Sequence, residues 1–173
     1  MSAVTDLKAV TIRTAVSEDA EGIARAFLES AEYHVGLDTE RYSTPSAESV
    51  SRRYRERRQH PRDARARAIT LVAELDGEIV GFVDARLERS PDPMHRDILY
   101  CHVVEIAVSR RHQNRGTGTQ LMEQAEAWGR RNGAAFASLE YHAANTRAGN
   151  FYQHRMGYSV AATILIKRLS HSR

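Results

Sequence analysis

The sequence lacks several features that would point to particular classes of protein. Its single cysteine, Cys101, rules out an internal disulfide, and this usage is typical of a reducing compartment. No apolar run approaches the ~20 residues that a membrane-spanning helix needs. The opening residues, MSAVTDLKAV, lack the basic-then-apolar layout of a secretory signal. We therefore expect a cytoplasmic protein that does not enter a membrane.

Other absences limit the kinds of site and of protein that the sequence is consistent with. The eight histidines show no metal-ligand spacing, so we expect no bound metal. Internal repeats are missing, and so are low-complexity tracts other than one run of arginines. The chain has 173 residues, of which 42% are hydrophobic and 27% charged, values that are ordinary for a globular protein. This length predicts a single domain over residues 1–173.

The net charge of +3 is concentrated in one segment, residues 52–67. Its acids are Glu56 and Asp63, and its eight arginines are at positions 52, 53, 55, 57, 58, 62, 65 and 67. The rest of the chain is net negative, so we do not expect a nucleic-acid partner. The arginines are interpreted as a solvated helix face. The alternative is that they border a substrate site and favour an acidic acceptor or partner.

Hydrophobic periodicity predicts a mixture of strands and helices without strict alternation. The predicted strands are residues 10–13, 69–75, 79–87, 98–108, 135–141 and 158–169. The predicted helices are residues 18–33 and 46–59, a helix from about 118 to Asn132-Gly133, and a short helix from Asn145 to Gly157. Asp76-Gly77 is a strong hairpin signal, and Pro61 should end the second helix. The mixture predicts one α/β domain with a mixed sheet and helices on both faces.

The stretch HQNRGTG, residues 112–118, joins a predicted strand to a predicted helix. A helix start leaves backbone N–H groups unpaired and carries partial positive charge, and glycines let the backbone approach a ligand closely. Such a turn typically binds a phosphate or pyrophosphate group. Further positive side chains surround it: Arg110, Arg111, His112 and Arg115.

Three phosphate-binding motifs must be distinguished at this turn. A Walker A loop needs a lysine that this turn lacks. A dinucleotide fingerprint needs a third glycine where Leu121 stands, although Glu140 falls near the expected position of a ribose-binding acid and keeps an NAD-binding interpretation open. The pattern Q/R-x-x-G-x-G/A is matched fully by residues 113–118.

On this motif the chain resembles the GNAT superfamily of acetyl-CoA-dependent N-acetyltransferases. The preceding strand, Glu105-Ile106-Ala107-Val108, resembles the family's fourth strand. Downstream, Asn145, Ala148, Tyr152, Gly157 and Tyr158 follow the family's N-x-x-A-x-x-x-Y-x-x-x-x-G-[FY] spacing without a gap. The Asp76-Gly77 hairpin, followed by Val80-Gly81-Phe82, also resembles the family's second and third strands. The likeness covers roughly residues 10–169 and is weakest over 33–67.

The resemblance implies a central, mostly antiparallel, twisted sheet with element order β-α-α-β-β-β-α-β-α-β(-β). The family usually ends with two strands, whereas only Tyr158–Leu169 remain here, without a turn signal. Either two short strands run on continuously or one is lost. The edge of the acceptor site and the existence of a homodimer therefore stay open.

The resemblance also implies a cofactor, acetyl-CoA, and the residues that hold it. The backbones of Ile106 and Val108 are expected to pair with the pantetheine arm, and the Val108 N–H to polarise the thioester carbonyl. Asn145 is expected to bond the pantetheine, to cap its helix, or both. The diphosphate-binding residues are expected in the glycine turn: Gln113, Asn114, Arg115, Gly116, Thr117, Gly118 and Thr119.

Acyl transfer to an amine requires a base and an acid. An amine with a pKa of ~10 is mostly protonated at neutral pH, so a base must remove a proton before it attacks. The resemblance implies that Tyr152 protonates the departing thiolate. It also suggests Glu140 as the base, ahead of Glu105 and His102. Strand alternation places Glu105 and His102 on opposite faces unless a bulge intervenes, so at most one should serve the site.

We therefore predict an N-acetyltransferase that moves an acetyl group from acetyl-CoA to a primary amine of a small molecule or a protein. One alternative is transfer of a longer acyl group, such as succinyl or propionyl. Two others are a nucleotide- or NAD-binding module and a nucleic-acid binder that uses the arginine run. The acceptor should be shaped by residues 33–45, the 88–97 loop and the C-terminal strands.

Overall fold

The computed structural model of the protein describes residues 10–59 and 68–169, without the side chains of residues 57–59. The chain divides into two compact units, Met1–Glu140 and Tyr141–Arg173, and each is described by itself. Among the described residues, the first unit contains the sheet and three α-helices, and the second contains one short α-helix followed by a π-helical turn.

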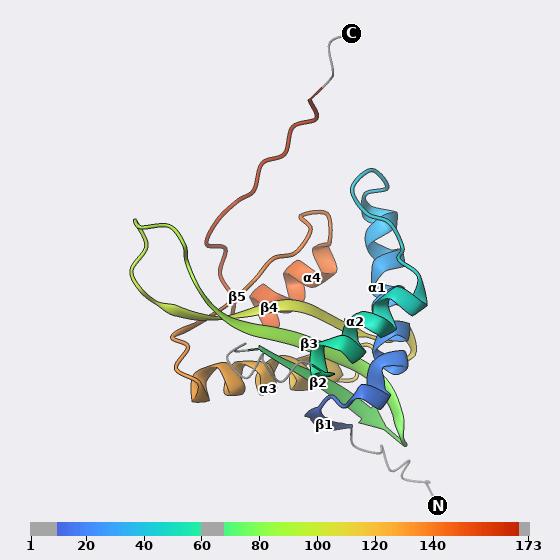
Figure 1. Cartoon of the computed structure of the whole chain (residues 1–173). Coiled ribbons are helices and arrows are strands. Elements are labelled where there is room, and N and C mark those ends of the chain that lie inside the picture. The colour runs from blue at the N-terminus through green and yellow to red at the C-terminus, as the bar shows by residue number, and fades with distance from the viewer. Residues whose placement is uncertain (1–9, 60–67, 170–173) are drawn as a thin grey trace, which may run out of the picture. The chain divides into compact units, whose positions relative to one another are not determined.

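A five-stranded sheet, with strand order β1-β2-β3-β4-β5, forms the centre of the first unit (Figure 1). Each of the first four strands is antiparallel to its neighbours among them, and β5 runs parallel to β4. Their bounds are β1 Thr11–Thr14, β2 Ala68–Leu75, β3 Glu78–Arg89, β4 Leu99–Val108 and β5 Phe136–Leu139. The β2–β3 turn is Asp76-Gly77, where both residues adopt the positive φ values of a tight hairpin, 52° and 80°.

Helices α1 (Ala20–Leu37) and α2 (Ala47–Gln59) cover one face of this sheet. The core beneath them centres on Phe82 of β3, whose ring stacks on Phe27 of α1 at 6.5 Å and meets Tyr54 of α2 edge-on at 5.4 Å. Their other buried partners are small or branched: Ala15, Ala20, Ile23, Ala24, Ala26, Val50, Val72, Ile79 and Ala107.

Helix α3 (Thr117–Arg131) covers the opposite face (Figure 1). Cys101 of β4 pairs with Leu87, an odd number of residues from Phe82, so its side chain points away from the α1–α2 side. The Cys101 thiol donates to the Ala125 carbonyl of α3 at 3.5 Å. The apolar side of α3 is completed by Leu121 and Met122, both fully buried. Helices on both faces of a mixed sheet confirm the predicted fold class.

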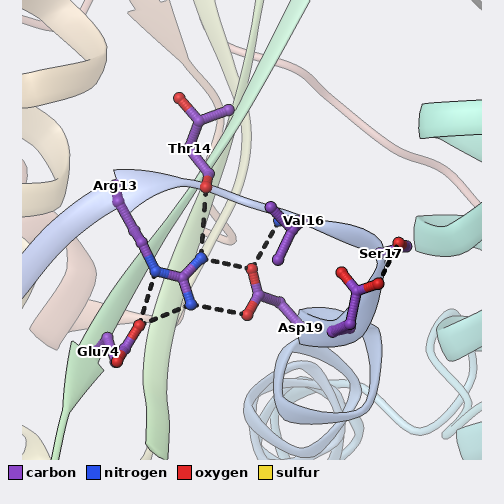
Figure 2. A network of polar contacts seen from close by, with 7 residues as sticks. Arg13, Thr14, Val16, Ser17, Asp19 and Glu74 are labelled. Carbon is purple, nitrogen blue, oxygen red and sulfur yellow. Dashed lines mark hydrogen bonds and ion pairs between the residues drawn. The ribbon is translucent and has the colours of Figure 1, made fainter. Parts of the chain in front are cut away.

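A network of charged side chains connects β1 to β2 and to the turn that precedes α1 (Figure 2). The Arg13 guanidinium of β1 donates to both Asp19 carboxylate oxygens, at 2.7 and 2.9 Å, and to Glu74 of β2 at 2.6 Å. Asp19 belongs to the 3-10 turn Ser17–Asp19 that leads into α1, and it also accepts from the Val16 N–H at 2.6 Å. One side chain thus links β1, β2 and the start of α1.

The second unit contains α4, Thr146–Asn150, which continues into a π-helical turn, Phe151–Arg155. The Asn145 carboxamide oxygen accepts from the Ala148 N–H at 3.0 Å, which confirms the predicted helix cap. Gly157 follows the turn with φ 76°, a backbone conformation that glycine adopts without strain.

The strand predicted over Tyr158–Leu169 is wrong. These residues form no strand, and every residue from Ser159 to Leu169 is exposed. Val160, Ile164 and Ile166 favour β-structure, but strand propensity reflects packing against neighbouring strands rather than a preference of the backbone alone. The element order therefore ends at α4 and its π-helical turn, without the expected last strand or strands.

Two other differences concern the α1–α2 region. Helix α1 continues to Leu37, so the loop predicted from residue 34 begins one turn later. The predicted stop at Pro61, and Arg62, Arg65 and Arg67 of the basic run, lie outside the described residues.

Candidate active site

Strand β4 carries an irregularity that decides where its polar side chains point. Val103 pairs with Ala85 and Glu105 pairs with Asp84, so the intervening Val104 is an extra residue without a partner on β3. This is a β-bulge, which bends the strand and increases its local twist.

Because of the bulge, His102 and Glu105 lie on the same face of the sheet. His102 pairs with Arg86 and Glu105 with Asp84, and residues two apart on a strand point to the same side. The placement on opposite faces that regular strand alternation predicts is therefore wrong, because the bulge lies between the two residues. Asp84 is two residues from Phe82, so this is the face that α1 and α2 cover.

Glu105 has the proton affinity that general-base chemistry requires. Burial raises the pKa of its carboxyl group from 4.5 to about 7, Arg53 of α2 acts to lower it, and Asp84 acts to raise it. A carboxyl group that titrates near neutrality can accept a proton from a substrate and release it again at working pH.

The other two base candidates lie in different surroundings. The His102 ring is half-buried, and its Nδ1 lies 3.1 Å from Ser138 Oγ of β5 and 3.6 Å from Glu88 Oε1 of β3. Glu140 comes directly after β5 and is exposed. Of the three side chains, His102 and Glu105 are thus brought to one face of β4, whereas Glu140 lies beyond the last strand.

The second half of β4 leaves one edge open within the described residues. Pairing with β5 runs only from Tyr100–Phe136 to Val103–Leu139 and stops at the bulge. From Glu105 to Val108, β4 pairs with β3 alone among the described strands. Its other edge can therefore accept an extended partner by adding main-chain hydrogen bonds, which is how a sheet edge binds an extended ligand. Ile106 and Val108 both lie on this stretch.

The glycine turn follows this open edge directly. It begins with a 3-10 turn, Arg110–His112, and the Gln113 carboxamide donates to the Val108 carbonyl at 2.7 Å. Asn114 and Gly116 then take positive φ values, 60° and 86°. Gly116 is the residue immediately before α3, so α3 starts at Thr117 without any side-chain cap.

These residues fit a phosphate-bearing cofactor such as coenzyme A. A Cβ built on Gly116 meets nothing within 4 Å, so the space in front of the first turn of α3 is open. The Thr117 hydroxyl is buried and has no hydrogen-bond partner among the described residues, which is rare for a polar atom unless a ligand or water reaches it. Asn114 and Arg115 are exposed beside the turn, whereas Gly118 and Thr119 form the first turn of the helix.

The remaining predicted site residues belong to the second unit. Tyr152 lies in the π-helical turn and is buried among three other aromatic rings, those of Tyr141, Phe151 and Tyr158, with centroids 5.8, 5.2 and 6.1 Å away. Single π-helical turns occur frequently at functional sites. Asn145, the cap of α4, is also buried.

Sequence analysis missed the residues that surround Glu105. Asp84 is only 3% exposed, and its carboxylate accepts from the Thr70 hydroxyl of β2 at 2.6 Å. A single acid inside an otherwise apolar strand, VGFVDA, was the available signal. Arg53 could not be distinguished by sequence from the other arginines of the basic run.

Two kinds of feature are absent from the part of the chain that the structure describes. None of the helices there is long and apolar enough to cross a membrane. Over the same residues, His, Cys, Asp and Glu side chains do not gather in groups of three or more that could hold a metal ion.

Known structures share this fold. A mutant of the BH1408 protein from Bacillus halodurans superposes with a TM-score of 0.82 and 20% identity, over 92% of this chain and 99% of that one. The aminoglycoside N-acetyltransferase AAC(6')-Iy, in complex with CoA, gives a TM-score of 0.74 and 17% identity, over 96% and 98%. The apo form of AAC(6')-IG from Acinetobacter haemolyticus gives 0.68 and 13%, over 94% and 99%.

The model of the acetyltransferase (GNAT) family matches residues 21–158, which include α1 after its first residue, the bulged β4, the glycine turn and Tyr152. This match covers most of the chain and agrees with the open strand edge, the uncapped helix start and the fold shared with these structures. The chain therefore belongs to the acetyltransferase (GNAT) family.

Proposed function

We propose that the protein transfers an acetyl group from acetyl-CoA to a primary amine. The observation that carries this proposal is Glu105: a carboxyl group that titrates near neutrality lies on the strand that leads directly into the glycine turn. A base and a cofactor site on consecutive segments are what amine acetylation needs. Both units together, residues 1–173, would form one N-acetyltransferase domain.

Each predicted cofactor residue has a role in this proposal. The N–H groups at the start of α3, around Gly116, Thr117, Gly118 and Thr119, bind the diphosphate, and Asn114 and Arg115 flank it. Gln113 holds the turn against the Val108 carbonyl. The open edge at Ile106 and Val108 pairs with the pantetheine arm, and Asn145 bonds the same arm.

Among the three candidates, we propose Glu105 as the base. It lies three residues before Val108, whose N–H would polarise the thioester carbonyl, and its pKa of about 7 suits proton acceptance at neutral pH. Acetyl-CoA, when bound, supplies the acetyl group as an activated thioester. Glu105 accepts a proton from the acceptor nitrogen, and the Tyr152 hydroxyl donates one to the departing sulfur.

For the acceptor we propose a small-molecule amine in the cytoplasm. Two proteins of the same fold are aminoglycoside N-acetyltransferases, whose acceptors are small molecules with amino groups. In the segment expected to shape the acceptor site, residues 33–45, the aromatic side chains of Tyr33 and Tyr42 are exposed and lie beside the His34 ring.

A panel of amines with detection of free CoA thiol tests the activity, with succinyl-CoA and propionyl-CoA as competing donors. Release of thiol with acetyl-CoA and at least one amine is expected. Glu105→Gln should lower kcat by a factor of about 100 or more, whereas Glu140→Gln and His102→Ala should have smaller effects. Tyr152→Phe should lower kcat with little change in cofactor affinity.

Cofactor binding is tested separately by melting temperature, because only a ligand that binds the folded state raises it. Gly116→Asn places a side chain in the open space before α3, and asparagine tolerates a positive φ better than other substitutes. The matched control is Gly133→Asn at the other end of α3, where φ is 87° and the space is equally open. CoA should stabilise the control but not the Gly116 variant. Equal stabilisation of both would refute the cofactor site.

A further inference from the structure

The Glu105 side chain does not stand alone on its face of the sheet. Asp84 is its direct partner across β3 and β4, and antiparallel partners on one face have Cβ atoms about 5 Å apart. Two carboxyl groups this close are costly in a poorly solvated place unless their arrangement is controlled. Their pairing depends on the bulge at Val104, since a regular strand would place Val104 opposite Asp84.

Asp84 is held in place from the far side. Thr70 of β2 is its partner in the β2–β3 ladder, and the Thr70 hydroxyl donates to Asp84 Oδ1 at 2.6 Å. Three neighbouring strands therefore contribute one polar side chain each, in the order Thr70, Asp84, Glu105. Because Asp84 is almost completely buried, its charge is poorly screened by water and acts strongly on its neighbour.

Other charged groups face Glu105 from the surrounding elements. Arg53 approaches from α2 and opposes the effect of Asp84. His102 lies on the same face of β4, and Arg86 follows Asp84 on the same face of β3. Helix α1 contributes small or apolar buried side chains to the core on this side.

We propose that Asp84 is a positioning residue for the transfer reaction, held by Thr70, which acts through Glu105 by facing it across the bulge and making it a stronger base. This inference rests on the proposed function, in which Glu105 takes the proton from the amine. Asp84 itself does not touch the substrate. Its negative charge is fixed at a distance at which it favours the protonated form of Glu105, so the acceptor's proton is taken more readily.

The test is a 13C NMR titration of the glutamate carboxyl groups, with the Glu105 signal identified by its loss in Glu105→Gln. Asp84→Asn, which keeps the shape and removes the charge, should lower the Glu105 midpoint by about one pH unit. Arg53→Gln should move it in the opposite direction. Glu78→Gln removes an exposed carboxylate from the start of the same strand and should leave the midpoint in place.

Kinetics provide the second readout. The acid-side limb of the kcat/KM profile should shift to lower pH in Asp84→Asn, and the plateau should fall by a factor of roughly three to ten, because a weaker base accepts the proton less readily. KM for the amine should change little. Asp84→Ser, smaller and also uncharged, is a second variant with the same expected direction if the asparagine variant folds poorly.

The outcomes separate this inference from the proposed function. A Glu105 midpoint that stays in place in the folded Asp84 variants would overturn the role of Asp84, even if Glu105→Gln abolishes transfer. Full transfer activity in Glu105→Gln would instead overturn the base assignment on which the inference rests, whatever the titration shows. A downward shift in the Asp84 variants, together with an upward shift in Arg53→Gln, would support it.

Discussion

At the scale of single residues, the proposed chemistry depends on a few side chains that lie where their charged forms are thermodynamically unfavourable. Burial raises the pKa of Glu105 to about 7, and a buried acid lies opposite it. Such an arrangement favours proton transfer and opposes folding, because the ionised form of Glu105 is destabilised only in the native state. Function and stability should therefore respond in opposite directions at this position.

The first prediction follows from this linkage. Between pH 4.5, the ordinary pKa of glutamate, and about 7, the native state holds the Glu105 proton more tightly than the unfolded chain. The free energy of unfolding should fall as pH rises through this window, by up to about 3 kcal/mol for this group. Glu105→Gln removes the effect, so the variant should gain stability relative to the parent between pH 5 and pH 8.

Urea unfolding at pH 5, 6, 7 and 8 measures this difference. Glu78→Gln, an exposed glutamate on β3, serves as the control and should follow the parent at every pH. A constant difference between Glu105→Gln and the parent over the whole range would mean that Glu105 titrates normally in the native state.

At the scale of elements, close packing between α3 and β4 places the glycine turn relative to the sheet. A Cβ on Gly129 of α3 would lie 2.5 Å from Cys101 Cβ and 2.7 Å from its sulfur, far inside van der Waals contact. Gly129 is therefore required for the helix to approach β4 this closely. Gly36, near the end of α1, has nothing within 4 Å of the same position.

The second prediction uses this contrast between two helical glycines. Gly129→Ala should destabilise the protein by about 1–3 kcal/mol, because α3 must move away from Cys101. Gly36→Ala should stabilise it by roughly 0.5–1 kcal/mol, because alanine restricts the unfolded chain and favours a helix. Chemical denaturation of both variants measures whether each substitution lowers or raises the free energy of unfolding. Equal effects would show that α3 does not pack on Cys101 as described.

Most elements could be predicted from the sequence because their signals are local. The period of Ile23 and Phe27, the Asp76-Gly77 turn and the Asn145 cap each depend on neighbouring residues, and each is found as expected. The register between strands is not local. Alternation along β4 gave the wrong faces for His102 and Glu105, because the bulge arises only when β4 pairs with β3.

The same limit explains the other errors. The role proposed for Asp84 depends on its partner across the sheet, Glu105, which a linear pattern does not reveal. Residues Tyr158–Leu169 have the β-branched composition of a strand, but composition does not supply a neighbour with which to pair. The turn HQNRGTG could be read because strand, glycines and helix follow one another directly in the chain.

At the scale of the whole molecule, the exposed C-terminal segment contrasts with the packed remainder. Val160, Ile164, Leu165, Ile166 and Leu169 are each 65–91% exposed. An apolar side chain stabilises the folded state only when folding removes it from water. These residues should therefore contribute little to the stability of the folded protein.

The third prediction is a truncation after Ser159, which keeps Tyr158 and its contacts with Tyr152. The free energy of unfolding should change by less than about 0.5 kcal/mol, since surface changes are usually within that limit. Light scattering during concentration should fall, because exposed apolar residues promote association. A loss of several kcal/mol, measured by urea unfolding, would show that the segment is buried in solution.

The single extra residue at Val104 has a consequence for any attempt to alter this enzyme. It coincides with the point where β5 stops pairing, and it also brings Glu105 opposite Asp84. The open edge of β4 and the position of Glu105 opposite Asp84 thus both begin at one extra residue. Under the proposed function, straightening β4 to change which acyl chains bind along its open edge should alter proton transfer as well, so the two properties must be optimised as a pair.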